Sequence, residues 1–443
     1  MSQLALLGGD PAVPKELRVF PYPMVEVDDV YAVLRVLKNG VLTGNKRKER
    51  EIAQFEADYA KFTGVRHCVA TQSGTSSLHL CMAAVGVEPG DEVILPALSF
   101  PASALSIVHQ QGIPVFVDID PVTFNIDPAL IEEKITPRTR AILVVHLHGL
   151  PAAMDDVLRV ARRHGLAVIE DSSHAHGSTY QGRRTGSLGD VAGASIMADK
   201  NFVTCGEGGA LTTDSDDYRR RSERLRMFGE VLTDSDTRTY AADTLGWNYR
   251  MNPLQAAFAR SQLPRLDAQN DLRRRNAAIL SEGLGQIPAL LPPVVPADRT
   301  GNFHMYRFRV DPARMGLDVP IGPFRLALQQ ALLAEGVAAR EWQNTPLPGQ
   351  RIFQERVGYG RGCPWTCKAS GEVSYRVEDY PQALATIEGS LVFAREIRSP
   401  VDPQVYHAYA GAFQKIFDRV DDLVAHARKL DYRPPWQHRI RLA

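Results

Sequence analysis

Two residues of this chain, Asp171 and Lys200, have types and surroundings that could do chemistry. Asp171 follows the apolar run Val168–Glu170, and Lys200 lies among small residues just before the glycine-rich run Gly206–Gly209. A lysine amine can form a Schiff base with the aldehyde of pyridoxal phosphate, and a carboxylate can pair with the pyridinium nitrogen of that cofactor. The pair therefore indicates a pyridoxal-phosphate enzyme. Taken singly, each residue has a plainer explanation. Asp171 could cap the next helix, and Lys200 could be an ordinary solvated surface lysine.

A phosphate site is indicated by the segment Gln72–Leu78, which follows an expected strand and opens an expected helix. Gly74 lets the backbone approach a ligand closely, Thr75 supplies a hydroxyl, and the helix N-terminus presents free N–H groups. The same residues also form an ordinary helix N-cap. This motif alone does not decide between the two.

Two further side chains come directly after expected strands. Phe100 could stack on a planar cofactor, and His174 could contact its ring or phenolic oxygen, because the carboxyl ends of parallel strands open into the ligand crevice of such sheets. Taken alone, Phe100 is also explained as a loop aromatic that covers the core, and His174 as a structural histidine.

The elements that must position these residues are short runs rich in valine and isoleucine that alternate with helix-like stretches between residues 65 and 212. This alternation predicts an α/β fold with buried parallel strands and helices on both faces of the sheet. The expected strands are 68–71, 92–95, 115–118, 141–145, 167–170 and 210–213. Beyond them, a long helix is expected over 253–284, a strand over 306–310, and helices over 323–335 and 403–427.

The length of 443 residues exceeds one ordinary domain. We expect an N-terminal arm over residues 1–25, a cofactor-binding large domain over 26–265 and a smaller α+β domain over 266–443.

Charge and hydropathy exclude several classes of partner. The formal net charge is zero, which gives no electrostatic reason to expect nucleic acid or an anionic membrane. No apolar run approaches the ~20 residues that span a bilayer, and the N-terminus lacks the features of a signal peptide. We therefore expect a cytoplasmic protein.

Five cysteines do not make a disulfide scaffold in a chain of this length. Cys363 and Cys367 are the only close pair. Zinc would need two more ligands at a suitable spacing, so we expect no metal and a loop with two free thiols.

Taken together and in order, the motifs resemble the DegT family of fold-type-I pyridoxal-phosphate aminotransferases, whose members aminate keto-sugars and keto-cyclitols, many of them in antibiotic pathways. The matching segments are Thr71–Thr75, Glu170–Gly177, Lys200 with Gly206–Gly209, and Gly246–Asn252. The opening Leu4–Pro11 and the loop Cys363–Trp365 are similar to the aminocyclitol branch, which includes scyllo-inosose aminotransferases. The enzyme that makes 3-amino-5-hydroxybenzoate is a near relative.

The resemblance implies a fold and a set of roles. The fold is a large domain with a mostly parallel seven-stranded sheet plus a smaller α+β C-terminal domain. By this resemblance, Lys200 forms the Schiff base with the cofactor, Asp171 pairs with its ring nitrogen and Phe100 stacks on its ring. His174 lies near the phenolic oxygen of the cofactor. The phosphate is held by Gly74, Thr75 and Ser195, and by Asn248 from the partner subunit of a homodimer. His304 and Tyr306, with Trp342 near a Pro-Leu-Pro turn, are the candidate substrate contacts. The run 195–199 departs from a more aromatic family pattern, which leaves the local pocket shape open.

The implied activity is transfer of an amino group from glutamine or glutamate to a keto-cyclitol or keto-sugar, by a ping-pong reaction through pyridoxamine phosphate. Freed Lys200 would act as base and then as acid. Family relatives with histidine in place of this lysine are sugar dehydratases, so Lys200 argues against that chemistry. Two alternatives stay open at this point: an aromatising enzyme of the aminohydroxybenzoate type, and a non-catalytic regulatory protein that binds the cofactor.

Overall fold

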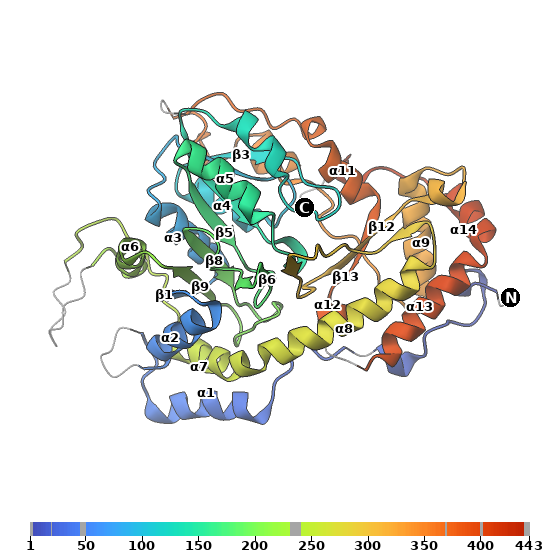
Figure 1. Ribbon diagram of the computed structural model, residues 1–443, viewed down its shortest axis with the longest axis horizontal. Coiled ribbons are helices and arrows are strands. Elements are labelled where there is room, and N and C mark those ends of the chain that lie inside the picture. The colour runs from blue at the N-terminus through green and yellow to red at the C-terminus, as the bar shows by residue number, and fades with distance from the viewer. Residues whose placement is uncertain are drawn as a thin grey trace.

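The computed structural model describes residues 3–18, 20–44, 50–230, 241–367, 370–398 and 402–437. A seven-stranded sheet lies at one end of the molecule and a small three-stranded sheet at the other, and the long helix α8 (Leu266–Gly285) runs between them (Figure 1). This arrangement confirms the predicted α/β fold with its mostly parallel large sheet. None of the helices in these ranges combines the length and the apolarity needed to cross a bilayer.

The large sheet holds its strands in the order β1 (His67–Thr71), β9 (Gly209–Thr213), β8 (Val191–Ser195), β5 (Ala167–Asp171), β4 (Thr139–Val145), β2 (Glu92–Pro96) and β3 (Ile113–Val117). Neighbours from β8 to β3 are parallel, whereas β9 runs antiparallel to both β1 and β8. Along β2, Val93 and Leu95 enter one core while Ile94 enters the core of the opposite face. Successive side chains of a strand point to opposite faces, so both faces of the sheet are buried.

Helices cover both faces of this sheet. Helices α3 (Gly74–Ala84), α4 (Pro101–His109) and α6 (Asp216–Arg226) lie on one face, and α5 (Met154–His164) lies on the other. Helix α2 (Glu51–Thr63) packs against β1 and α7 (Pro253–Gln262), and α1 (Val27–Asn39) packs on α7. A short three-stranded sheet holds β11 (Arg299–Thr300), β6 (Thr179–Tyr180) and β7 (Arg183–Arg184) in that order.

The single helix expected over 253–284 is broken near its middle. Helix α7 ends at Gln262, the short 3-10 turn Leu263–Arg265 follows, and α8 begins at Leu266. Pro264 lies in that turn because proline has no backbone N–H to donate and its ring clashes with the preceding helical turn. The helix expected over 403–427 is likewise two helices, α13 (Gln404–Phe417) and α14 (Val420–Ala427).

The small sheet consists of β10 (Leu290–Leu291), β12 (Tyr306–Val310) and β13 (Ser390–Phe393), with α8, α9 (Ile321–Ala334), α13 and α14 packed around it. The N-terminal arm joins this core through Leu4 and Val13. Buried Glu335 accepts hydrogen bonds from the backbone N–H groups of Ala5 and Ala12, each at 2.8 Å. The arm is therefore held against the C-terminal part of the chain.

The described residues between Leu347 and Ile387 pack against the large sheet, because Leu347, Phe353, Tyr375 and Ile387 join the core on the α3 and α4 face. It contains α10 (Arg351–Gln354) and α11 (Pro381–Glu388), and the short helix α12 (Arg395–Arg398) follows it. The domain boundaries expected at residues 25 and 265 stay a prediction.

The expectation of two free thiols in this segment is wrong, since Cys363 and Cys367 form a disulfide with Cα atoms 5.7 Å apart. The turn of the loop brings the two side chains together.

Candidate functional site

Asp171 ends β5 at the carboxyl edge of the sheet, on the face that α4 covers. Its Oδ2 accepts a 2.8 Å hydrogen bond from Ser103 Oγ, and its Oδ1 accepts a 3.2 Å bond from the backbone N–H of Ser173. Ser99 Oγ lies 2.9 Å from Ser103 Oγ. Because Ser103 gives its only proton to Asp171, Ser99 must be the donor in the second bond. The carboxylate is thus held by a short chain of hydroxyls.

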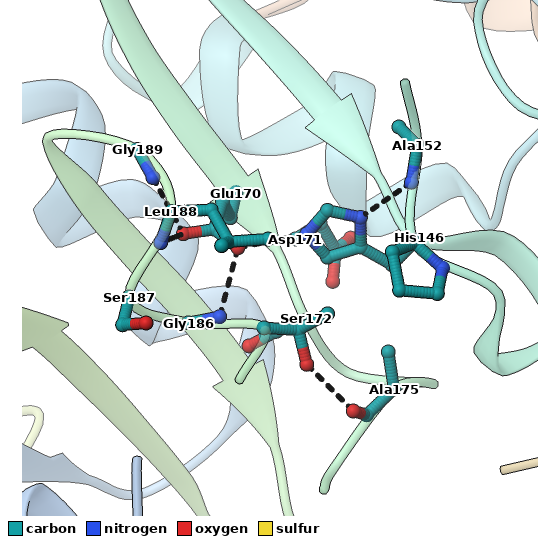
Figure 2. Close-up of polar contacts among 12 residues, drawn as sticks. His146, Ala152, Glu170, Asp171, Ser172, Ala175, Gly186, Ser187, Leu188 and Gly189 are labelled. Carbon is teal, nitrogen blue, oxygen red and sulfur yellow. Dashed lines mark hydrogen bonds and ion pairs between the residues drawn. The ribbon is translucent and has the colours of Figure 1, made fainter. Parts of the chain in front are cut away.

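The preceding residue, Glu170, points to the opposite face and is completely buried (Figure 2). Its oxygens accept from His146 Nε2 and from the backbone N–H groups of Gly186, Leu188 and Gly189, at 2.7–2.8 Å. His146 Nδ1 accepts from the backbone N–H of Ala152 at 3.0 Å, so the ring proton lies on Nε2. Burial raises the pKa of Glu170, but the bonds from His146 and the backbone outweigh it and hold the pKa below its ordinary value.

Lys200 lies in the turn between β8 and β9, where its backbone N–H donates to the carbonyl of Met197 at 2.8 Å. Its own carbonyl accepts from the hydroxyl of Tyr22 in the N-terminal arm. The neighbouring carbonyl of Asp199 accepts from the guanidinium of Arg398. Burial lowers the pKa of the Lys200 amine to about 8, although the negative charge of Asp171 opposes that shift. The amine and the carboxylate are therefore close enough to act on each other.

The glycine-containing turn after β1 forms a close contact with the end of β8. Ser73 is the N-cap of α3 and accepts from the backbone N–H of Ser76 at 3.1 Å. A Cβ on Gly74 would lie 2.4 Å from the Cβ of Ser195, so no larger residue fits there. Gly74, Thr75 and Ser195 thus meet at the free N–H groups of a helix N-terminus, the geometry that binds phosphate.

An aromatic cluster lies beside the lysine. The ring of His174 stacks on His304 with centroids 4.1 Å apart, and Trp342 lies 5.7 Å from His174. Burial and then the charge of Lys200 lower the pKa of His174 well below its ordinary value. Its Nδ1 is buried and bonds to nothing in the described parts of the chain. Phe100, the N-cap residue of α4, is 58% exposed.

Asn248 and Tyr306 lie away from this cluster. Asn248 is exposed and accepts from Arg250 Nε at 2.9 Å. The structure places Tyr306 differently from the prediction: its ring is fully buried in the core of the small sheet, and its hydroxyl lies 2.9 Å from that of Ser281. Tyr306 is therefore a core residue, although His304, two positions earlier, does join the cluster.

Two contributors were not found from the sequence. Ser103 holds Asp171 from a helix far away along the chain, and the only sequence signal for it is its place in the first turn after Phe100. His148 packs 5.1 Å from Trp342 with a positive φ of 59°, and no pattern in the sequence indicates that backbone conformation.

These residues fit pyridoxal phosphate. Asp171 supplies a carboxylate for the ring nitrogen, Lys200 an amine for the aldehyde, and Gly74 a cradle that a Cβ would fill. The unbonded Nδ1 of His174 is a buried polar atom that a cofactor oxygen would satisfy. Among the residues that the structure describes, no group of three or more histidine, cysteine or acidic side chains is arranged to hold a metal ion.

Comparison with known proteins gives consistent matches. The family model described as the DegT/DnrJ/EryC1/StrS aminotransferase family matches residues 24–375. The chain is 33% identical over 434 residues to L-glutamine:scyllo-inosose aminotransferase of Streptomyces griseus, which covers 95% of this chain and 99% of that protein. It is 37% identical over 313 residues to spore coat polysaccharide biosynthesis protein SpsC of Bacillus subtilis (strain 168), which covers 69% and 79%. The solved structure of 3-amino-5-hydroxybenzoic acid synthase superposes with a TM-score of 0.78 at 26% identity, and covers 91% and 99%.

These matches confirm the resemblance found in the motifs, and they include relatives of both kinds that it implied, a scyllo-inosose aminotransferase and 3-amino-5-hydroxybenzoic acid synthase. The chain therefore belongs to the DegT/DnrJ/EryC1/StrS aminotransferase family, and it is a pyridoxal-phosphate-dependent aminotransferase.

Proposed function

We propose that this enzyme moves an amino group from glutamine or glutamate to a keto-cyclitol or keto-sugar of the scyllo-inosose type, in secondary metabolism. The observation that carries this proposal is the end-to-end match to an L-glutamine:scyllo-inosose aminotransferase over 95% of the chain, together with a site that holds the lysine and the acid that the chemistry needs. We expect two half-reactions, in which the keto acid from the donor leaves before the acceptor binds.

Lys200 is proposed as the base and then the acid of both half-reactions. Bound pyridoxal phosphate supplies an electron sink for the electrons left when the α-proton of the donor is removed. Lys200 Nζ takes that proton from the α-carbon and then delivers it. A pKa of about 8 leaves a useful fraction of the amine neutral near neutral pH and still lets it act as an acid.

The other cofactor contacts are proposed from their positions. The carboxylate of Asp171, oriented by Ser103, is expected to accept from the ring N–H. Phe100, exposed at the end of β2, is expected to cover one face of the ring. Gly74, Thr75 and Ser195 are expected to hold the phosphate at the N-terminus of α3, and His174 the phenolic oxygen.

A homodimer with shared active sites is part of the proposal. Asn248 is exposed and its side chain is turned to Arg250, which supports a role outside its own subunit. We expect it to reach the phosphate in the partner subunit. His304 and Trp342, which pack with His174, are the proposed substrate contacts on the same chain.

The test is to incubate the purified enzyme with glutamine or glutamate and a panel of keto-cyclitols and keto-sugars, and to identify the amine by mass spectrometry. We expect an aliphatic amino-cyclitol or amino-sugar, and no turnover by the Lys200→Ala variant. Formation of an aromatic amine would replace this proposal with the aromatising reaction. If no amino acid changes the absorbance spectrum of the cofactor, the result would favour a regulatory protein that binds the cofactor without catalysis.

A further inference from the structure

Arg307 on β12 is a buried cation with neutral partners. It is 1% exposed. Its hydrogen-bond acceptors in the described residues are His148 Nε2 at 2.9 Å, Ser390 Oγ at 2.9 Å, the carbonyl of Trp342 at 3.0 Å and Gln343 Oε1 at 3.3 Å. Burial lowers the pKa of Arg307 to about 9, so the side chain is still charged at neutral pH. A buried charge without an opposite charge is costly, and a bound anion would remove that cost.

The bonds of Arg307 determine which atoms of its neighbours face outward. Arg307 Nε donates to His148 Nε2, so the proton of the neutral His148 ring lies on Nδ1. Burial, followed by the charge of Arg307, lowers the pKa of His148 well below its ordinary value and keeps the ring neutral. Gln343 accepts from Arg307 through Oε1, which leaves its amide NH₂ as a donor. Within the described parts of the chain, His148 Nδ1 and Gln343 Nε2 are both buried and bonded to nothing.

These two donors lie beside the proposed active site. The His148 ring is nearly parallel to that of His174, with centroids 6.5 Å apart, and lies 5.1 Å from Trp342. His174 in turn feels the charge of Lys200. His148 and Gln343 both have positive φ, 59° and 57°, a conformation that costs free energy in residues other than glycine and is concentrated at functional sites.

We propose that His148 Nδ1 and the Gln343 amide bind a carboxylate of the amino-acid donor, with Arg307 as the positioning residue whose charge favours the anion. The inference rests on the proposed function, because an amino-acid donor must bring its carboxylate close to Lys200. Two free N–H donors beside an uncompensated cation match an acceptor-only, anionic group. The hydroxyls of a cyclitol could use the same donors but would leave the charge of Arg307 unpaired.

The sharpest test is the nearly isosteric variant Gln343→Glu. Its new carboxylate can pair with Arg307, so the cofactor-free variant should unfold at the same temperature as the wild type or higher. The same carboxylate would repel that of the donor. We expect Kd for 2-methylglutamate, which has no α-proton to lose, to rise at least tenfold, whereas KM for the keto acceptor should change less than threefold. Gln286→Glu, on an exposed helix end, is the matched control and should change neither constant.

A second pair of variants tests the other donor. His148→Phe keeps a ring but loses the N–H, and should weaken 2-methylglutamate about tenfold. His148→Asn keeps an N–H, tolerates positive φ, and should recover part of the loss.

Other results would overturn the inference. If only the KM for the acceptor increases, His148 and Gln343 bind hydroxyls of the acceptor instead. If the Kd for 2-methylglutamate and the acceptor KM are unchanged in both Gln343→Glu and His148→Phe, the two donors bind a buried water rather than a substrate. The proposed function is tested apart from this: if the wild type transfers no amino group but binds 2-methylglutamate in a Gln343-dependent way, the carboxylate site stands and the proposed function falls.

Discussion

Glu170 and Asp171 are consecutive acids with opposite tasks. Consecutive side chains of a strand point to opposite faces, so Asp171 meets Ser103 on the α4 face while Glu170 enters the core beside His146. All the hydrogen-bond partners of Glu170 are donors, and its carboxylate is held without any exposure to solvent. Such a network is stable only while every member is satisfied.

The Glu170→Gln variant should lower the free energy of unfolding by about 3 kcal/mol at pH 7. The NH₂ group of the new amide would face N–H donors with which it cannot bond, and the buried charge-assisted hydrogen bonds are lost. The folded-state pKa of Glu170 is below its ordinary value. Its stabilising contribution is therefore complete above the unfolded-state pKa of about 4.3 and is lost as the pH falls through the lower folded-state value.

Urea unfolding of both proteins across pH 7 to 3 measures this difference. The gap between wild type and Glu170→Gln should narrow at the acid end. Glu223→Gln, which removes a partly exposed ion pair with Arg219, is the control and should cost less than ~1 kcal/mol. A gap that widens in acid would contradict the assigned role of Glu170.

The second prediction at this scale concerns the rate at which Lys200 reacts with added cofactor. Only the neutral amine attacks an aldehyde, so with a pKa of about 8 the rate should rise roughly tenfold per pH unit below pH 8 and level off above it. Stopped-flow absorbance after mixing pyridoxal phosphate with cofactor-free enzyme measures the rate, and Lys200→Ala gives the background. A rate that keeps rising beyond pH 10 would mean that the lysine is not buried as described.

Residue types and their order along the chain were enough to single out Asp171 and Lys200 as candidates, and the structure brings the two side chains near each other. Contacts between distant segments were not predictable in this way. Ser103 and Asp171, or His148 and Arg307, become neighbours only after the sheet has formed. Tyr306 was expected at the site, with His304, from the family resemblance, whereas strand alternation and packing direct its ring into the core of the small sheet.

At the scale of elements, α4 carries two of the residues proposed for the cofactor site, one for ring stacking and one that orients Asp171. Phe100 is the N-cap residue of α4, and Ser103 lies in the first turn of the same helix, so the start of one helix places both groups. The hydrogen bond from Ser103 orients the carboxylate that we propose for the ring nitrogen of the cofactor.

Removing that bond in Ser103→Ala should weaken the affinity for pyridoxal phosphate at least about tenfold, since a hydrogen bond to a charged group is worth roughly 1.5–3 kcal/mol. Equilibrium titration of the cofactor-free enzyme gives Kd. Ser106→Ala is the matched control, because Ser106 is buried on the same helix but donates to the carbonyl of Ser103 rather than to Asp171. Equal losses in the two variants would contradict a specific role for Ser103.

Five strands of the large sheet were expected from short valine- and isoleucine-rich runs, and β9 from the glycine-rich run before it, but β8 was not expected. Its sequence, Val-Ala-Gly-Ala-Ser, has only one of the β-branched side chains that mark a strand, and its other four residues are small. Gly193 is there because Leu78 of α3 packs against its backbone, where a Cβ would lie 2.8 Å from that side chain. The break at Pro264 was predictable in principle, since proline in a helical pattern ends or kinks the helix.

At the scale of the whole molecule, the N-terminal arm contacts both the C-terminal part of the chain and the turn that carries Lys200. Glu335 binds the backbone of Ala5 and Ala12, and Tyr22 reaches the carbonyl of Lys200. No pattern in the first 25 residues predicts these contacts, because they depend on where the C-terminal helices place Glu335.

The proposed dimer predicts complementation between inactive subunits. Lys200→Ala removes the reacting amine, and Asn248→Ala removes the residue expected to reach the partner's phosphate site. In a mixed dimer one of the two sites keeps both residues, so random mixing after refolding should restore roughly a quarter of the wild-type activity per subunit. Measured turnover of each variant alone is the control, and no recovery in a proven mixed dimer would exclude a shared site.

The four donors around Glu170 also fix the register of β5 relative to its neighbouring strands at the centre of the sheet. If β5 slipped by one residue, an aspartate one methylene shorter would face His146 and the turn after β7, while the longer acid would face the cofactor side. Such a slip would be costly in free energy because it breaks the buried hydrogen bonds around Glu170, whatever its effect on the proposed cofactor contacts. Selection for a correctly assembled core would therefore keep Asp171 in place even when no substrate is present.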